Sequence, residues 1–276
     1  MNDVRVMAPD GPDYPMGLLD LEDPPHLYVI GETTTAPAVA VVGTRRCTRY
    51  GLSLADAFGH GLSRAGWTTV SGLARGIDAA AHRGTLRGEG SAVAVLGSGV
   101  DVVYPIENAD LYRAILRSGG AILSEYPPGT RPDRWRFPAR NRIIAGISSA
   151  VVVVEAGEKG GALITARLAA ELGRPVFVVP GDIDRPASIG CNRLIRDGAH
   201  PVLGADDLMA ELELILGKPT NHVPPSEGVI PATGLAFDDL PSIWECTPAE
   251  ALARLARMEI AGEARRVGDL VLPGSG

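Results

Sequence analysis

The sequence predicts an α/β fold, a mostly parallel, doubly wound sheet with helices on both faces, followed by a smaller C-terminal module. Short β-branched runs alternate with helical stretches between residues 38 and 216. These runs are apolar on both faces, which is typical of parallel strands covered on both sides. With 276 residues, 45% of them hydrophobic and 21% charged, the chain can bury a large core, which excludes wholesale disorder and a coiled coil.

The expected strands follow one another along the central part of the chain, at 38–42, 67–70, 92–96, 121–123, 149–155 and 175–179. Helical patterns lie between or after them, at 52–64, 162–172 and 206–216. Each strand is followed by a glycine-containing turn or a polar loop. Because ligands of open α/β sheets bind outside the carboxyl ends of the strands, these loops are where a site is expected.

The two ends of the chain differ from the centre. Residues 1–30 are acidic and proline-rich and are expected to form an extended lead-in. Residues 31–216 are expected to form the main domain. Four prolines and three glycines in 217–234 indicate a linker, taken as 217–235. In 236–276, a capping pattern at 247–250 opens a helix with Leu252, Leu255 and Ile260 on one side, and 263–272 can form a hairpin, as at the end of a winged helix.

Composition excludes several functional classes. No apolar run approaches the roughly 18 to 20 residues of a membrane span, and the N-terminus shows no signal peptide, so no membrane association is expected. The three cysteines, Cys47, Cys191 and Cys246, are far apart and lack paired ligands, so neither a disulfide framework nor a metal site is expected. A reducing cytoplasm fits this pattern best.

The net charge of −7 conceals an uneven distribution. Residues 1–30 carry one basic and six acidic side chains, 31–203 carry 20 and 15, and 204–276 carry five and 12. The centre is therefore basic, and nearly all its cations are arginines, whose planar guanidinium suits phosphate and stacks on bases. High-GC codon usage is an alternative reason for the arginines.

The loop after the first central strand contains Gly43, Thr44, Arg45 and Arg46. The three-glycine dinucleotide fingerprint is missing, and a hydroxyl and arginines lead into a helix N-terminus, where free N–H groups favour an anion. The loop after the second strand repeats this combination, with Ser71, Gly72 and Arg75. Both are expected to bind phosphate, and an ordinary turn with solvated arginines is the alternative.

Further candidates follow in the same loops. Asp78 and His82 lie four residues apart on one helical face, which suits either acid–base work or, more simply, a cap and a satisfied helix pair. After the fifth strand, Lys159, Gly160 and Gly161 form a third candidate anion site at a helix start. No Walker A pattern is present, so nucleotide hydrolysis with magnesium is not indicated.

The densest basic stretch, 131–142, places two rings, Trp135 and Phe137, among five arginines. Arginines that follow a phosphate chain, with rings on which bases stack, are typical of single-stranded nucleic acid binding. The alternative is that the rings fill the core and the arginines are merely solvated. The candidate binding residues of this stretch are Arg134, Phe137, Arg140, Asn141 and Arg142.

Five blocks in one order resemble the DprA/Smf DNA-processing family throughout residues 10–205: VGTR at 42–45, SGLARGID at 71–78, LSEYP at 123–127, FPARNRII at 137–144 and GALITAR at 161–167. The resemblance implies that residues 31–216 form an extended Rossmann-like domain that binds single-stranded DNA, forms homodimers and helps to load the RecA recombinase in natural transformation (competence) and DNA recombination. It implies no catalysis and no cofactor. By position, the DNA site would use Arg45, Ser71, Gly72, Phe137 and the block at 140–142.

The chain departs from the family at its ends. The N-terminal helical domain of many members is absent from this sequence, and the winged-helix module is cut down to a helix and a hairpin. Residues 238–273 hold four arginines and seven acids, a charge that favours a protein contact over duplex DNA. The family's dimer points to the half of the domain containing Leu194 and Ile195, an apolar pair on a short helix that could equally belong to the core.

An enzyme is the alternative function. A nucleoside-monophosphate-processing hydrolase on a Rossmann-like sheet would use Glu125 or Glu155 as its carboxylate, with the glycine loops holding the phosphate. The resemblance to phosphoribohydrolases is only partial, because 157–161 lacks the order of their PGGxGTxxE motif. No activating group for Glu155 is apparent in the sequence.

Overall fold

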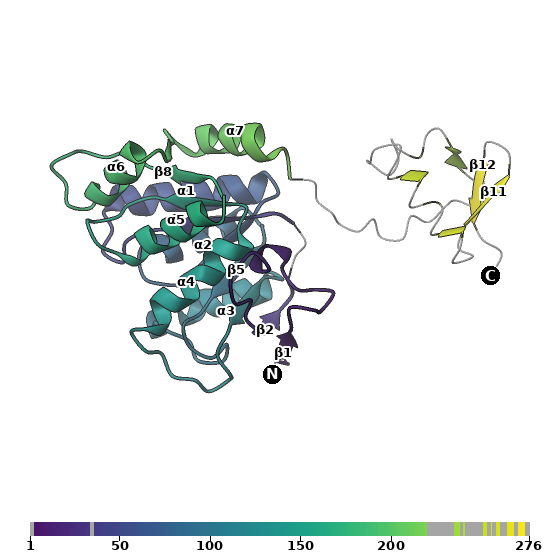
Figure 1. Ribbon diagram of the computed structural model, residues 1–276, viewed down its shortest axis with the longest axis horizontal. Coiled ribbons are helices and arrows are strands. Elements are labelled where there is room, and N and C mark those ends of the chain that lie inside the picture. Colours follow the sequence, from purple (N-terminus) through teal and green to yellow (C-terminus); the bar gives the residue numbers. More distant parts are fainter. Residues whose placement is uncertain are drawn as a thin grey trace. The chain divides into compact units, whose positions relative to one another are not determined.

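The computed structural model describes residues 3–33, 36–219, 235–237, 240, 251–252, 255, 258–259, 264–267 and 270–273. The chain divides into two compact units, Met1–Asn221 and His222–Gly276 (Figure 1).

The larger unit contains a sheet of nine strands in the order β1-β2-β6-β5-β4-β3-β7-β8-β9. The pairs from β6 to β9 are parallel, whereas β1 pairs antiparallel with β2 and β2 with β6. All parallel strands therefore end at one rim of the sheet. The strands are β1 (Arg5–Met7), β2 (Leu27–Gly31), β3 (Ala38–Val42), β4 (Thr68–Ser71), β5 (Ala92–Val95), β6 (Ala121–Ser124), β7 (Ala150–Val153), β8 (Val176–Val178) and β9 (His200–Pro201).

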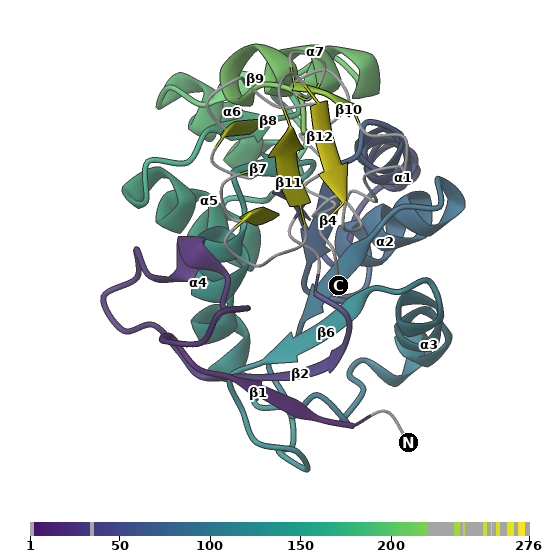
Figure 2. The same ribbon diagram turned by 90° about the vertical axis from the view of Figure 1, so that its right-hand side faces the viewer.

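Helices cover both faces of this sheet. Figure 2 shows α1, α2 and α3 on one side and α4, α5 and α6 on the other. Their bounds are α1 (Arg49–Arg64), α2 (Ile77–Arg87), α3 (Ala109–Arg117), α4 (Arg136–Ile147), α5 (Gly161–Glu171), α6 (Ile189–Arg196) and α7 (Ala205–Leu216), with 3-10 turns at Met16–Leu18 and Ile106–Asn108.

The strands alternate between two cores because successive side chains point to opposite faces. In β3, Ala40 and Val42 pack on the side of α4 and α5, whereas Val39 and Val41 pack with α1 and α2. All five residues of β3 are buried, which explains why the central strands are apolar throughout their length. The predicted fold class, a mostly parallel and doubly wound Rossmann-like sheet, is confirmed.

The six predicted strands are all present, with ends displaced by no more than two residues. The N-terminal segment differs from the prediction, because residues 1–30 are not a separate extended lead-in. Strand β2 extends the sheet by pairing with β6, and Tyr14, Leu18 and Leu27 are buried in the core. Strand β2 was not predicted because the prolines and acidic residues in the exposed turns around it dominate the composition of this segment.

The smaller unit contains a sheet of three strands, β10 (Leu235–Ala236), β11 (Ala264–Val267) and β12 (Leu270–Pro273), in the order β10-β12-β11. The predicted hairpin is confirmed, since β11 pairs antiparallel with β12. The hairpin packs on Ala251 and Leu255, whereas Leu252 is exposed rather than buried beside Leu255. The expected linker lies largely outside the described residues, as do most of the expected helix and Ile260.

Candidate nucleic-acid cleft

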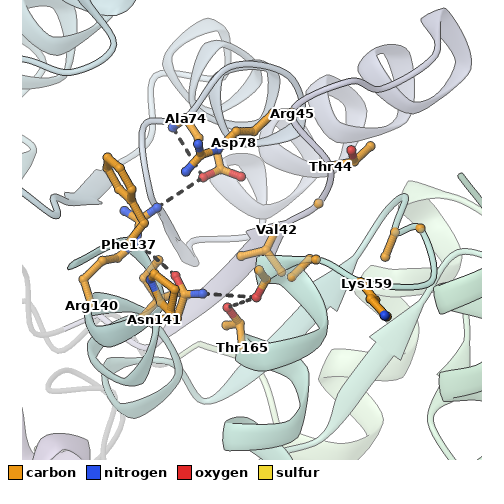
Figure 3. A pocket seen from close by; sticks show the side chains of 18 of the residues that line it. Val42, Thr44, Arg45, Ala74, Asp78, Phe137, Arg140, Asn141, Lys159 and Thr165 are labelled. Atoms are coloured by element: carbon orange, nitrogen blue, oxygen red, sulfur yellow. Dashed lines mark hydrogen bonds and ion pairs between the residues drawn. The ribbon is translucent and has the colours of Figure 1, made fainter. Parts of the chain in front are cut away.

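A cleft of about 590 Å³ opens in the larger unit at the carboxyl ends of β3, β4 and β7, beside the N-terminal halves of α4 and α5. This is where an open α/β sheet is expected to bind its ligand. Figure 3 shows Phe137, Arg140 and Asn141 of α4 beside Arg45 and Asp78, with Lys159 on the opposite side of the pocket. The cleft also brings together these candidate residues from distant loops: Gly43, Thr44, Arg46, Arg134, Lys159, Gly160 and Gly161.

Four exposed cations line the cleft: Arg45, Arg46, Arg134 and Lys159. None of them forms an ion pair with another described residue. No carboxylate among the described residues therefore holds these four side chains in a salt bridge. A mobile anion such as phosphate can bind such side chains without first breaking a salt bridge.

Two aromatic rings lie at one side of the cleft. The ring of Phe137 stacks on Tyr104, with the centroids 5.4 Å apart and the planes at 28°. The guanidinium carbon of Arg45 lies 4.9 Å from the centroid of Phe137, in a cation–π contact. The sequence did not single out Tyr104, because a lone tyrosine in the loop after β5 has no arginine cluster around it.

The floor of the cleft is built by Arg140, whose side chain is buried. Its Nη1 donates to the carbonyl oxygens of Gly72, at 2.9 Å, and Val95, and its Nε donates to Asn141 Oδ1 at 3.0 Å. Burial lowers the pKa of Arg140 to about 10, although the nearby Asp78 opposes that change, so the guanidinium stays charged at neutral pH. Arg140 thereby joins the loops after β4 and β5 to α4.

Position 72 must be a glycine because the Arg140 guanidinium lies directly against it. A Cβ at this position would lie 2.0 Å from an Arg140 nitrogen, far inside any permitted contact. Gly76 is required for a different reason, since its φ of +81° favours glycine and a Cβ would lie 2.6 Å from the carbonyl oxygen of Thr44. These two glycines allow the loop after β4 to approach both α4 and the loop after β3.

Asp78 fills the anion site that was predicted after β4. Its carboxylate accepts the backbone N–H groups of Gly72 at 3.1 Å and Ala74 at 3.4 Å, and lies 4.0 Å from Arg140. Burial raises the pKa of Asp78 above its usual value, against the opposing charge of Arg140. A phosphate therefore cannot use these N–H groups without displacing the protein's own carboxylate.

His82 does not act with Asp78 as an acid–base pair. Its ring is fully buried, and neither ring nitrogen has a hydrogen-bond partner, so it is not a satisfied helix pair either. Burial, reinforced by the charge of Arg140, lowers the pKa of His82 to about 3. The imidazole is thus neutral at physiological pH.

Glu155 fills the anion site at the start of α1. Its carboxylate accepts the backbone N–H of Thr48 at 2.8 Å and the Thr48 hydroxyl at 2.5 Å, and Thr48 in turn caps the helix at Gly51. The predicted phosphate site at this helix N-terminus is thus occupied by a side chain. Arg45 and Arg46 lie outside the capped turn, and neither forms an ion pair with a described residue.

The third predicted anion site, at the start of α5, contains no such carboxylate. Gly160 provides no side-chain cap, and the first turn of α5 has no acid. Lys159, Gly160 and Gly161 are exposed in the cleft wall. The buried Thr165 also lines the cleft and donates to the carbonyl oxygen of Gly161 at 3.3 Å; it was not singled out in the sequence because it lies within a helix.

Four predicted binding residues do not line this cleft. Ser71 is fully buried and donates its hydroxyl hydrogen to the carbonyl oxygen of Val41 at 2.7 Å. Arg142 pairs with Glu125 at 2.6 Å. Gly72 and Arg75 line a small recess beside the cleft, and Arg75 pairs with Glu107 at 2.5 Å.

No group of three His, Cys, Asp or Glu side chains able to hold a metal ion occurs in the part of the chain that the structure describes. Within the same residues, no helix is both long and apolar enough to span a bilayer.

The fold and the cleft define a Rossmann-like α/β protein whose candidate site combines aromatic rings with cations that form no ion pair with a described residue. The model of the family of DNA recombination-mediator protein A matches residues 5–213. The chain belongs to this DprA/Smf family of DNA-processing proteins.

Relatives and solved structures agree with this assignment. Protein Smf of Synechocystis is 46% identical over 218 residues, covering 76% of this chain and 54% of its own, and DprA of Bacillus subtilis is 40% identical over 203 residues, covering 72% and 68%. The crystal structure of DprA from Streptococcus pneumoniae matches with a TM-score of 0.71 and 41% identity, over 75% of this chain and 74% of that one.

A second solved structure, of DNA processing protein A from Helicobacter pylori, describes that protein's single-stranded DNA binding mode. It matches with a TM-score of 0.68 and 29% identity, over 77% of this chain and 98% of that one. The chain spans about half the length of the Synechocystis relative.

Proposed function

We propose that this protein binds single-stranded DNA in the cleft, through phosphate contacts to Arg45, Arg46, Arg134 and Lys159 and base stacking at Phe137. The observation that carries the proposal is the coincidence of four unpaired cations with a stacked ring pair in one cleft. Cations follow the phosphate chain, and rings accept any base. The binding mode described for the Helicobacter pylori relative supports the same ligand.

The proposal is for a binding protein rather than an enzyme. The two carboxylates of the alternative, a nucleoside-monophosphate hydrolase, are both engaged in structural contacts, Glu155 with Thr48 and Glu125 with Arg142. Neither lines the cleft. Incubation with nucleoside monophosphates would release free base if the alternative held.

RecA loading, homodimer formation and a cytoplasmic location belong to the same proposal. Leu194 and Ile195 are partly buried against the core, so each has surface left for a partner, and Leu203 nearby in the sequence is 83% exposed. Leu203→Glu is the cleaner test of a dimer, because so exposed a residue accepts a charge without unfolding the chain. We expect a folded monomer by sedimentation and circular dichroism; a dimeric L203E removes this surface from the interface.

The DNA proposal is tested by titrating oligo-dT and a duplex of equal length at several salt concentrations. We expect preference for the single strand, and a log–log salt slope of roughly −0.7 for each phosphate neutralised. Equal affinity for the duplex, or affinity independent of salt, contradicts the proposal. Arg87→Ala is the matched control, since this exposed arginine pairs with Asp56 and does not line the cleft.

A further inference from the structure

A second aromatic cluster lies outside the cleft and is formed by Tyr126, Trp135 and Arg136. The rings of Tyr126 and Trp135 meet edge to face, with centroids 6.0 Å apart. The guanidinium carbon of Arg136 lies 5.0 Å from the centroid of each ring. Arg136 also donates to the carbonyl oxygen of Arg131, so the cluster is held in place on several sides.

Trp135 is exposed although it is held in a defined orientation. Its indole N–H donates to Asp133 Oδ2 at 3.0 Å, yet 58% of the residue is accessible to solvent. Trp67, by comparison, is 3% exposed and belongs to the core. The fold thus does not need the Trp135 ring for its packing, and an oriented, exposed indole is available to a ligand.

The position of Trp135 continues the cleft. Arg134 and Phe137, its close neighbours in the sequence, both line the cleft, and Tyr126 follows the end of β6, at the same rim of the sheet. Residues two apart at a helix start point in different directions, so Trp135 and Phe137 cannot stack on the same base. The two rings are suited to different bases of one strand.

We propose that Trp135 is a second stacking platform, which binds a base of the single strand where that strand leaves the cleft past Arg134. This inference rests on the proposed function and adds to it a path for the DNA beyond the cleft. Residues 126–137 carry three arginines and one acid, a positive charge that suits a phosphate chain. An indole stacks on any base, so the platform adds affinity without adding sequence preference.

The experiment compares wild type, W135A and W135F in binding to labelled dT oligomers of increasing length. For W135A we expect unchanged affinity for the shortest oligomer that binds. The gain in affinity with length should be about 5- to 150-fold smaller than in wild type, as expected for one stacked base. W135F keeps a ring and should retain most of the gain. Met16→Ala, an exposed apolar residue of the first 3-10 turn, is the control and should bind as wild type.

A second readout does not depend on affinity. A base stacked on the Trp135 indole quenches its fluorescence, so long oligomers should quench wild type more than W135F. The inference is overturned if W135A binds every length as wild type does, or if it is weakened equally at all lengths. It is also overturned if W135A changes only self-association, which would assign the ring to a protein contact. Failure of wild type to bind any dT oligomer would instead refute the proposed function itself.

Discussion

Removal of the Phe137 ring tests the cleft most directly. In the structure this ring is already in contact with two partners, the stacked Tyr104 and the guanidinium of Arg45 at 4.9 Å. A base that stacks on the face of Phe137 covered by Arg45 must therefore displace the Arg45 guanidinium. The displaced guanidinium then becomes available to the adjacent phosphate.

The magnitude follows from these contacts. Stacking of a base on an aromatic ring contributes about 1 to 3 kcal/mol, whereas an exposed cation–π contact contributes about 0.5 to 1 kcal/mol. The Phe137→Ala variant loses the stacking energy, but DNA that binds to it no longer has to break the cation–π contact with Arg45. Subtracted end by end, the expected net loss is about 0.5 to 2 kcal/mol, which corresponds to roughly a two- to thirty-fold weaker affinity for oligo-dT.

The assay is a titration of labelled oligo-dT, followed by anisotropy, at one low salt concentration. Phe137→Trp keeps an aromatic face and should bind within a few-fold of wild type, whereas Phe137→Leu keeps only apolar volume and should behave like the alanine variant. Identical circular dichroism spectra exclude a folding defect. Wild-type affinity in F137A, or equal affinity of the leucine and tryptophan variants, would falsify a stacking role for this ring.

Three further predictions follow from the same site. Arg45→Ala should weaken binding and reduce the salt slope by about 0.7, because one phosphate contact is lost; an unchanged slope places Arg45 outside the phosphate path. Gly72→Ala should lower the free energy of unfolding by about 2 to 4 kcal/mol in urea, since the buried Arg140 guanidinium must move and lose charged hydrogen bonds. Gly160→Ala, where a Cβ meets nothing within 4 Å, is its control. His82 has a folded-state pKa of about 3, below the ordinary 6.5, so its contribution to stability is present above pH 6.5 and is lost as the pH falls. Between pH 7 and 5.5 the wild type should lose about 1 kcal/mol that His82→Leu does not lose, and equal losses in urea unfolding would contradict the burial of a neutral imidazole.

Local sequence patterns predicted the elements that carry the cleft. The strand at 38–42 was predicted with its observed ends, because an apolar β-branched run bounded by proline and glycine has few other structures available. The parallel arrangement then places the loops at 43–46 and 159–161 at one rim, so their convergence followed from the fold class. Strand β2 was missed, since its pairing with β6 depends on residues far away in the sequence.

Periodicity and short local patterns in the sequence were enough to predict the fold class, the family and the loops in which binding groups gather. Tertiary packing then sets which of those groups are without an ion pair or a capping carboxylate. Glu155 and Asp78 occupy two of the three expected anion sites, and Arg142 is paired with Glu125. Whether a backbone N–H or a guanidinium is available depends on which carboxylate packs against it. Asp78 lies close in sequence to the N–H groups that it accepts, whereas Glu155 and Glu125 reach Thr48 and Arg142 from other segments of the chain. Distances between such segments are set by the packing of the whole sheet, which no local pattern encodes.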